Sequence, residues 1–360
     1  MKKKSLLIIV LILALSFVFS ACGPKAEPEP VQEAEPVVEE AEPVVEEAEP
    51  VVEEEEEAEP VVEEEEKVYE VTLILKDNTS AGWRYLSAAA IAAGPEYGIN
   101  VTEISPLATQ DADEQYRIFE DQIEKGVDGI IIAPVDSAGI VPAIERANEA
   151  GIPVLTTNTR AFVENEEDVI GFVGVENKEG GYEIAKYMFS QFEGDDPIRL
   201  IIINGNMTGQ TSIDRIDGIY EAVAEDERVV VLEDQEAKFS RAEAQTLMEN
   251  LLVRFDEIDL VIALNDEMAI GAFNAIEAAG RLDEILISGF DGAPEGLEAI
   301  LAGDIVATLT QDLPAQGSEA VCVMRAYLDG EPYDYWTKTG GVVITAENAQ
   351  EYLDKFGVRE

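Results

Sequence analysis

The sequence predicts an α/β fold built from two doubly wound parallel-sheet domains. From residue 71 onward, short apolar runs alternate with amphipathic stretches, which is the pattern of parallel strands connected by helices that cover the sheet. The 294 residues that follow position 66 are long enough to form two packed domains. Together, the alternation and the length favour two sheets, each with its own helices.

The apolar runs can be placed in order along the chain. Buried strands are expected at residues 71–75, 129–133, 154–157, 200–203, 229–232, 260–264, 285–290 and 305–309. Amphipathic helices are expected between them, for example over 115–124 and 242–252. Gly94-Pro95 should end or kink the first helix, because proline removes a helical hydrogen bond. The first alternating series closes near 174–176, which places a domain boundary there.

Residues 1–22 have the layout of a secretory signal, with three lysines at 2–4 followed by an apolar run over 6–19. Small residues precede Cys22, so residues 19–23 are similar to a lipoprotein cleavage box in which Cys22 receives the lipid. A plain signal peptide with an incidental Cys22 is the alternative. The protein is therefore expected to be exported and lipid-anchored at the cell envelope, in the periplasm or on the outer face of the plasma membrane.

Residues 23–66 hold 20 Glu and one Lys, with the repeat Ala-Glu-Pro-Val-Val-Glu-Glu. A proline in every repeat excludes a coiled coil, and the repelling charges predict an extended, disordered tether. After residue 66 the chain still carries 20 Lys and Arg against 56 Asp and Glu, a net charge of −36. Such a field repels nucleic acid and anionic membrane surfaces, so membrane contact is expected only through the lipid on Cys22.

Two polar runs follow apolar strands in the C-terminal third of the chain. They are Asn-Asp-Glu-Met-Ala-Ile-Gly at 265–271 and Gly-Phe-Asp-Gly at 289–292. The carboxyl edge of a parallel sheet is where small ligands bind, and from about residue 68 to its end the chain resembles the ribose-binding-protein family of periplasmic sugar-binding proteins. That resemblance implies the type I periplasmic binding fold, in which three strand crossings form a hinge. Here they fall near 174–176, 311–313 and 338–341.

The domains implied are 67–175 with 312–339, and 176–311 with 340–360. The resemblance also assigns ligand contacts, with two aromatic residues stacking on the sugar ring and polar side chains holding its hydroxyls. Matching positions give Trp83 and Phe239 for stacking, and Arg215, Asn265, Asp291 and Gln311 for hydrogen bonding. A surface salt bridge of Arg215 with Asp214 or Asp217 is the alternative. Asp266 and Glu267 are expected to complement the helix dipole.

The first domain departs from the ribose pattern. Asn158-Thr159-Arg160 stands where ribose binders carry Asp-Arg, so a carboxylate has become an amide and the arginine is displaced by one position. Asn158 is expected to contact the ligand, and Lys76 or Asp77 to replace a lost polar contact. The ligand is therefore expected to differ from ribose. Another pentose, a hexose, an inositol and a furanose-like autoinducer stay open.

The resemblance implies a substrate-binding lipoprotein of an ABC-type sugar importer, which binds a monosaccharide or related polyol and docks on a membrane permease. The alternative is a sensor that presents the ligand to a chemoreceptor or kinase. The chain has no histidine and no Gly-x-Ser-x-Gly elbow, so an enzyme is not expected. No cofactor or metal is expected, since the sequence has no calcium-loop pattern and no His or Cys cluster.

Overall fold

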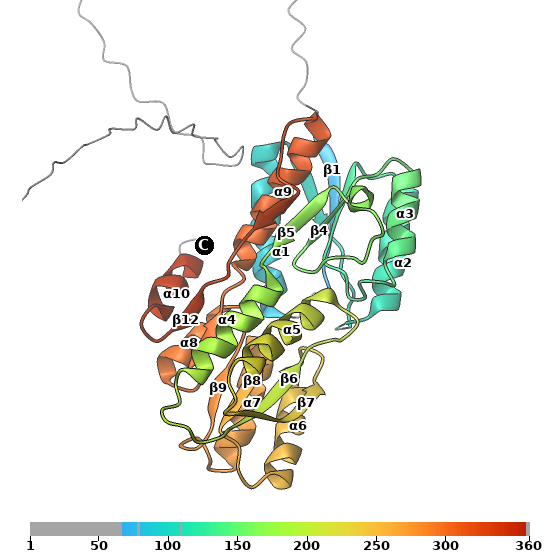
Figure 1. Cartoon of the computed structure of the whole chain (residues 1–360). Coiled ribbons are helices and arrows are strands. Elements are labelled where there is room, and N and C mark those ends of the chain that lie inside the picture. The colour runs from blue at the N-terminus through green and yellow to red at the C-terminus, as the bar shows by residue number, and fades with distance from the viewer. Residues whose placement is uncertain (1–66, 78–79, 109, 358–360) are drawn as a thin grey trace, which may run out of the picture. The chain divides into compact units, whose positions relative to one another are not determined.

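The computed structural model describes residues 67–77, 80–108 and 110–357. Residues Lys67–Glu360 form one compact unit. The predicted signal sequence, the predicted lipidation site Cys22 and the predicted acidic tether lie outside the described residues. Figure 1 shows the unit as two lobes, with helices α2 and α3 on the N-terminal one and α6 and α7 on the other.

The N-lobe is built on a six-stranded sheet with the order β11-β5-β4-β3-β1-β2, in which every pair of neighbouring strands is parallel. Its elements are β1 (Tyr69–Ile74), α1 (Ala81–Ala93), η1 (Gly94–Tyr97), β2 (Ile99–Glu103), α2 (Ala112–Lys125), β3 (Gly129–Ile132), α3 (Val141–Glu149), β4 (Val154–Thr157), η2 (Glu166–Asp168), β5 (Gly171–Gly174), α9 (Leu313–Asp329) and β11 (Trp336–Lys338).

The C-lobe repeats this plan with the strand order β12-β10-β9-β8-β6-β7. Its elements are α4 (Asn177–Phe189), β6 (Ile198–Asn204), α5 (Gln210–Ala224), β7 (Val229–Glu236), α6 (Arg241–Arg254), β8 (Leu260–Ala263), α7 (Asp266–Ala278), β9 (Leu286–Ser288), α8 (Pro294–Ala302), β10 (Ala307–Leu309), β12 (Val343–Thr345) and α10 (Ala349–Gly357). The last strand, β12, pairs antiparallel with β10, and the other pairs are parallel.

Both faces of the N-lobe sheet are buried, because side chains of a strand alternate between its two faces. Leu73 of β1 packs with α1 and α9, whereas the next residue, Ile74, packs with α2 and α3. The same alternation separates Ile131 from Ile130 in β3. Strands buried on both sides read as continuous apolar runs, which explains why the sequence revealed them.

Three segments pass between the lobes: β5 to α4, β10 to α9, and β11 to β12. The last two are bonded to each other, since the Gly341 nitrogen donates to the Thr310 carbonyl over 2.7 Å and the Thr339 hydroxyl donates to the Gln311 carbonyl over 3.0 Å. Gly340 has a φ of 64°, and a Cβ there would lie 2.3 Å from the Thr310 oxygen. Only glycine therefore fits this crossing.

The predicted fold class of two doubly wound parallel-sheet domains is confirmed. The first helix ends at Ala93, where Gly94-Pro95 begins a 3-10 turn, as the sequence indicated. Four strands were not predicted: β2, β5, β11 and β12. Among the described residues, no helix combines the length and the apolar character that crossing a membrane requires.

Candidate functional site

One pocket lies where the carboxyl ends of the two sheets face each other. All nine side chains predicted as ligand contacts line it: Lys76, Asp77, Trp83, Asn158, Arg215, Phe239, Asn265, Asp291 and Gln311. Most of them lie within three residues after the end of a strand, as Asn158 does after β4 and Asp291 after β9. The pocket is thus formed by loops and helix starts at sheet edges, where parallel sheets commonly place ligands.

Arg215, on α5, is a large side chain that is almost fully buried in the pocket, with 1% of its surface exposed. Its Nε donates to the Asn177 Oδ1 over 2.9 Å, its Nη1 donates to the Leu264 carbonyl over 2.5 Å, and Nη1 lies 3.7 Å from the Asp291 Oδ1. The guanidinium carbon is 3.6 Å from the ring centre of Phe290. Burial lowers the pKa of Arg215 to about 10, so the side chain stays charged at neutral pH.

Two details of Arg215 bear on ligand binding. Its Nη2 is buried and has no hydrogen-bond partner within the described part of the chain. The alternative of a surface salt bridge with Asp214 or Asp217 is wrong, because Arg215 is buried and Asp214 pairs with Arg160. A buried donor left without a partner is costly, so this nitrogen can donate to a polar group that enters the pocket.

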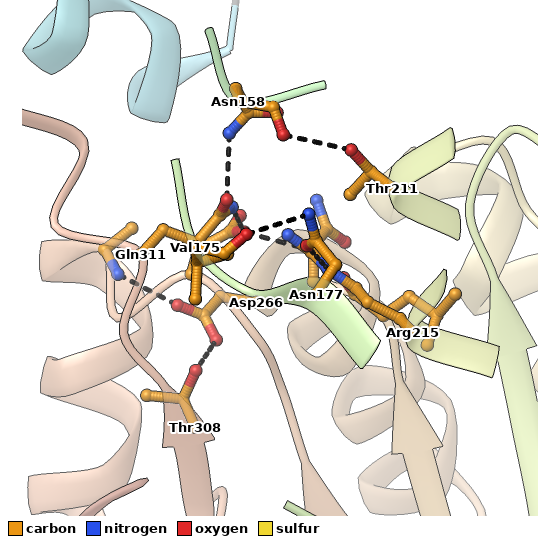
Figure 2. Close-up of polar contacts among 12 residues, drawn as sticks. Asn158, Val175, Asn177, Thr211, Arg215, Asp266, Thr308 and Gln311 are labelled. Carbon is orange, nitrogen blue, oxygen red and sulfur yellow. Dashed lines mark hydrogen bonds and ion pairs between the residues drawn. The ribbon is translucent and has the colours of Figure 1, made fainter. Parts of the chain in front are cut away.

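Asp291 connects Arg215 to the opposite lobe. Its Oδ1 accepts from the Gln311 Nε2 over 2.5 Å, and the Gln311 Oε1 accepts from the Asn158 Nδ2 over 2.8 Å. Burial raises the pKa of Asp291 to about 6, and the neighbouring Arg215 opposes this rise. Figure 2 shows Asn158, Gln311 and Arg215 within one continuous network of polar contacts.

Lys76 follows β1 and is buried with 2% exposure. Its Nζ lies 5.9 Å from the ring centre of Trp83 on the N-lobe and 5.5 Å from that of Phe239 on the C-lobe. Among the described residues it makes neither a hydrogen bond nor an ion pair. Burial, together with the charge of Arg215, lowers the pKa of Lys76 to about 7 against the opposing charges of Asp291 and Asp77.

Asp77 and Asn265 shape the pocket walls. The Asp77 carboxylate accepts from the Ser80 nitrogen over 2.8 Å and from its hydroxyl over 3.0 Å. The Asn265 Oδ1 accepts from the Met268 nitrogen over 2.9 Å and so caps α7. The amide nitrogen of Asn265 is a donor that this cap does not use. Glu267 is held by Arg241 through two hydrogen bonds of 2.8 and 2.9 Å.

Asp266 is a pocket residue whose burial the sequence did not indicate. It begins α7 as expected, but only 3% of its surface is exposed. Its Oδ1 accepts from the Thr308 hydroxyl over 2.6 Å, as Figure 2 shows, and its Oδ2 accepts from the Ala293 nitrogen over 3.0 Å. Burial, with the nearby charge of Asp291, raises the pKa of Asp266 well above its usual range. Asp266 therefore lies in the first turn of α7 as predicted, and it is a buried acid there.

The backbone around the pocket is strained. Four non-glycine residues that line it have positive φ: Gln110, Asn158, Phe239 and Asp291, at 62°, 60°, 59° and 129°. Such conformations persist only where the surroundings fix them, and they concentrate at binding and catalytic sites. Gln110, Thr211, Glu295 and Leu313 also line the pocket and were not predicted, because no strand end or motif in the sequence marks them.

Two sheets with a ligand pocket at their facing edges define a two-lobed binding protein, and comparison with known proteins identifies its family. Residues 71–332 match the periplasmic binding protein domain. The chain therefore belongs to this family, as a ribose-binding-protein-like type I periplasmic binding protein. The family that the sequence motifs indicated is thus confirmed.

Individual relatives are similar over most of the two lobes. The ribose import binding protein RbsB of Salmonella typhimurium is 35% identical over 214 residues, which cover 59% of this chain and 69% of that protein. The xylitol-binding protein of Mycolicibacterium smegmatis is 32% identical over 256 residues, or 71% of this chain and 70% of the relative. An ABC transporter solute binding protein from Bacillus halodurans with bound myo-inositol superposes with a TM-score of 0.71 at 30% identity, covering 80% of this chain and 98% of that one.

Proposed function

We propose that this protein binds a monosaccharide or related polyol in the pocket between its lobes. The observation that carries the proposal is the polar chain from Arg215 through Asp291 and Gln311 to Asn158, which lies beside two aromatic rings in one pocket. Charged and amide groups suit adjacent hydroxyls, which both donate and accept. Aromatic faces suit the apolar C–H surface of a sugar ring.

The proposed binding mechanism is closure of the lobes on the ligand. Lys76, Trp83 and Asn158 belong to the N-lobe, whereas Arg215, Phe239, Asn265 and Asp291 belong to the C-lobe. A ligand that touches both sets gains its full contacts only when the lobes meet, so binding shifts the equilibrium toward the closed form. The three segments that pass between the sheets are our proposed hinge, and the predicted domain boundaries follow from them.

We further propose that the protein is the exported substrate-binding component of an ABC-type sugar importer, anchored through a lipid on Cys22. Similarity to a ribose import binding protein and to an ABC transporter solute binding protein supports this role. Uptake of the labelled sugar by cells that lack the gene tests it. Unchanged uptake together with a lost response to the sugar would instead favour the sensor that serves a chemoreceptor or kinase.

Binding itself is tested by thermal unfolding of the full chain with D-ribose, D-allose, L-arabinose, xylitol and myo-inositol. A sugar that binds the native state alone raises the melting temperature, and calorimetry then gives its affinity. Asp291→Ala should make the shift much smaller at the same sugar concentration, whereas Asp256→Ala, at an exposed position of the C-lobe, should keep it. The sugar should be recovered unchanged, because we propose binding without catalysis. A folded protein whose melting temperature responds to none of a wide range of sugars and polyols contradicts the proposal.

A further inference from the structure

The two lobes also touch beside the pocket, where the start of α5 meets N-lobe loops and where Thr211 lines the pocket edge. The Ser137 Oγ accepts from the Gln210 nitrogen over 2.9 Å, and the Ser137 nitrogen donates to the Thr208 carbonyl over 3.1 Å. The hydroxyls of Thr159 and Thr211 lie 2.6 Å apart. These bonds join the lobes directly, without a ligand between them.

Arg160 makes the charged contact of this interface. Its Nη2 donates to the Asp214 Oδ2 over 2.8 Å. The guanidinium carbon lies 5.7 Å from the ring centre of Phe172 on β5 and 5.4 Å from that of Trp336 on β11. The Arg160 guanidinium therefore packs near aromatic rings from strands of the N-lobe sheet, whereas the carboxylate that accepts its hydrogen bond belongs to α5 of the C-lobe.

The position of Arg160 explains the displaced arginine of the sequence. Arg160 is not among the residues that line the pocket, and its side chain points to the other lobe instead. Asp214 is largely shielded, with 12% of its side chain exposed, whereas 41% of the Arg160 side chain is exposed. Gln210 also donates to Asp214, which fixes the carboxylate toward Arg160.

We propose that Arg160 and Asp214 form a latch between the lobes, one that holds the closed form and sets how long a bound sugar is retained. This proposal rests on the proposed sugar binding. The latch bonds exist only while the lobes meet, so breaking them raises the rate of opening and hence of sugar release, with little effect on association. Arg160 and Asp214 are thus positioning residues that act without touching the sugar.

The test compares the full-length wild type with Arg160→Gln, Asp214→Asn and the double variant. The probe is whichever of D-ribose, xylitol and myo-inositol gives the largest thermal shift, and its release is followed by stopped-flow tryptophan fluorescence. A partly exposed ion pair of this kind corresponds to about 3- to 5-fold faster release in each single variant. The double variant should release little faster than either single one, because the pair acts as a unit.

Salt and a second ion pair provide the controls. About 1 M KCl should speed release from the wild type and leave Arg160→Gln unchanged, since salt screens an ion pair only where one exists. Arg199→Gln breaks a 3.1 Å pair with Asp259 inside the C-lobe, so it should lower the melting temperature without altering release. If Arg160→Gln does not fold, Arg160→Lys replaces it, because lysine keeps the charge and loses the planar fork.

A measurement without sugar separates the latch from the proposed function. Spin labels placed through an unnatural amino acid at Glu145 on α3 and Asn250 on α6 report the distance between the lobes. The sugar-free wild type should populate the short distance more than Arg160→Gln does. Equal distance distributions and equal release rates would overturn the latch, whereas a lack of response to every sugar would overturn only the proposed ligand.

Discussion

Replacing Lys76 by methionine should stabilise the sugar-free protein. Lys76 is buried between two aromatic rings, and none of the described residues forms a hydrogen bond or ion pair with it. Its pKa falls from 10.5 to about 7. Each pKa unit corresponds to about 1.4 kcal/mol, so the buried ammonium costs up to about 5 kcal/mol of unfolding free energy below pH 7.

The sign of the pH dependence follows from proton binding. Between pH 7 and 10.5 the unfolded chain keeps the Lys76 proton and the native state releases it, so the contribution of Lys76 to stability rises with pH in this window. The advantage of Lys76→Met should therefore be largest at pH 6 and small near pH 10. Subtracting the wild type at each pH removes the contributions of titrating groups that do not interact with Lys76. Lys76 lowers the pKa of Asp291, so the loss of that attraction is part of the measured difference.

Urea unfolding of both proteins at pH 6, 8 and 10 measures the difference. Lys338→Met is the matched control, because that lysine is exposed on β11 and lies 4.8 Å from the ring centre of Trp336. It should change stability little at any pH. Equal unfolding free energies of Lys76→Met and wild type at pH 6 would refute the reasoning. The stabilised variant should also gain less from sugar, since binding sites commonly trade stability for function.

Three further predictions concern the pocket and the anchor. Asp291→Ala should weaken sugar binding by about 2–4 kcal/mol, because it leaves Arg215 and the sugar hydroxyls without their acceptor; calorimetry within twofold of wild type would contradict this. Phe239→Ala and Trp83→Ala should each lose about 1–3 kcal/mol through removed apolar contact, and unchanged affinity in both would place the sugar elsewhere. Cys22→Ser should move the protein from the membrane to the soluble fraction with its sugar affinity intact; continued membrane association would exclude the lipid anchor.

Most of the strands that sequence patterns revealed are buried along their length. β7 is an exception, a partly exposed edge strand, and the fully buried β5 was missed because a glycine stands at each end of its four residues. β3 and β4 are fully buried and read as apolar runs. β2, at the sheet edge, alternates buried and exposed residues over Ile99–Glu103. Its polar residues interrupt the apolar run, so the sequence did not indicate a strand there. β11 and β12 have three residues each, most of them only partly buried, whereas the equally short β9 and β10 are mostly buried and lie in longer apolar runs. Pairing with strands that are distant in the sequence determines where such strands form, and local hydrophobic periodicity gives no information about that pairing.

Most of the pocket residues were predicted from positions that match the family's motifs, and the structure brings all nine predicted residues together in one pocket. Their contact with a sugar stays a prediction. Asp266 could not be recognised as buried, because its neighbours Gly289, Gly296 and Thr308 come from distant segments. Arg160 could not be paired with Asp214 from sequence for the same reason, since the partner lies on the other lobe.

The hydrogen bonds between the second and third crossings restrict how the lobes can move. Two neighbouring segments joined at Gly341–Thr310 and Thr339–Gln311 behave as a narrow ribbon. A ribbon of this kind twists and bends readily but resists sliding of one edge along the other, because sliding would break its cross-bonds. In the proposed closure, this would favour rotation of the lobes about a line through the crossings. Gln311 lies at that line and is hydrogen-bonded to Asp291 and Asn158, so a rotation of the lobes would change these hydrogen bonds in the pocket.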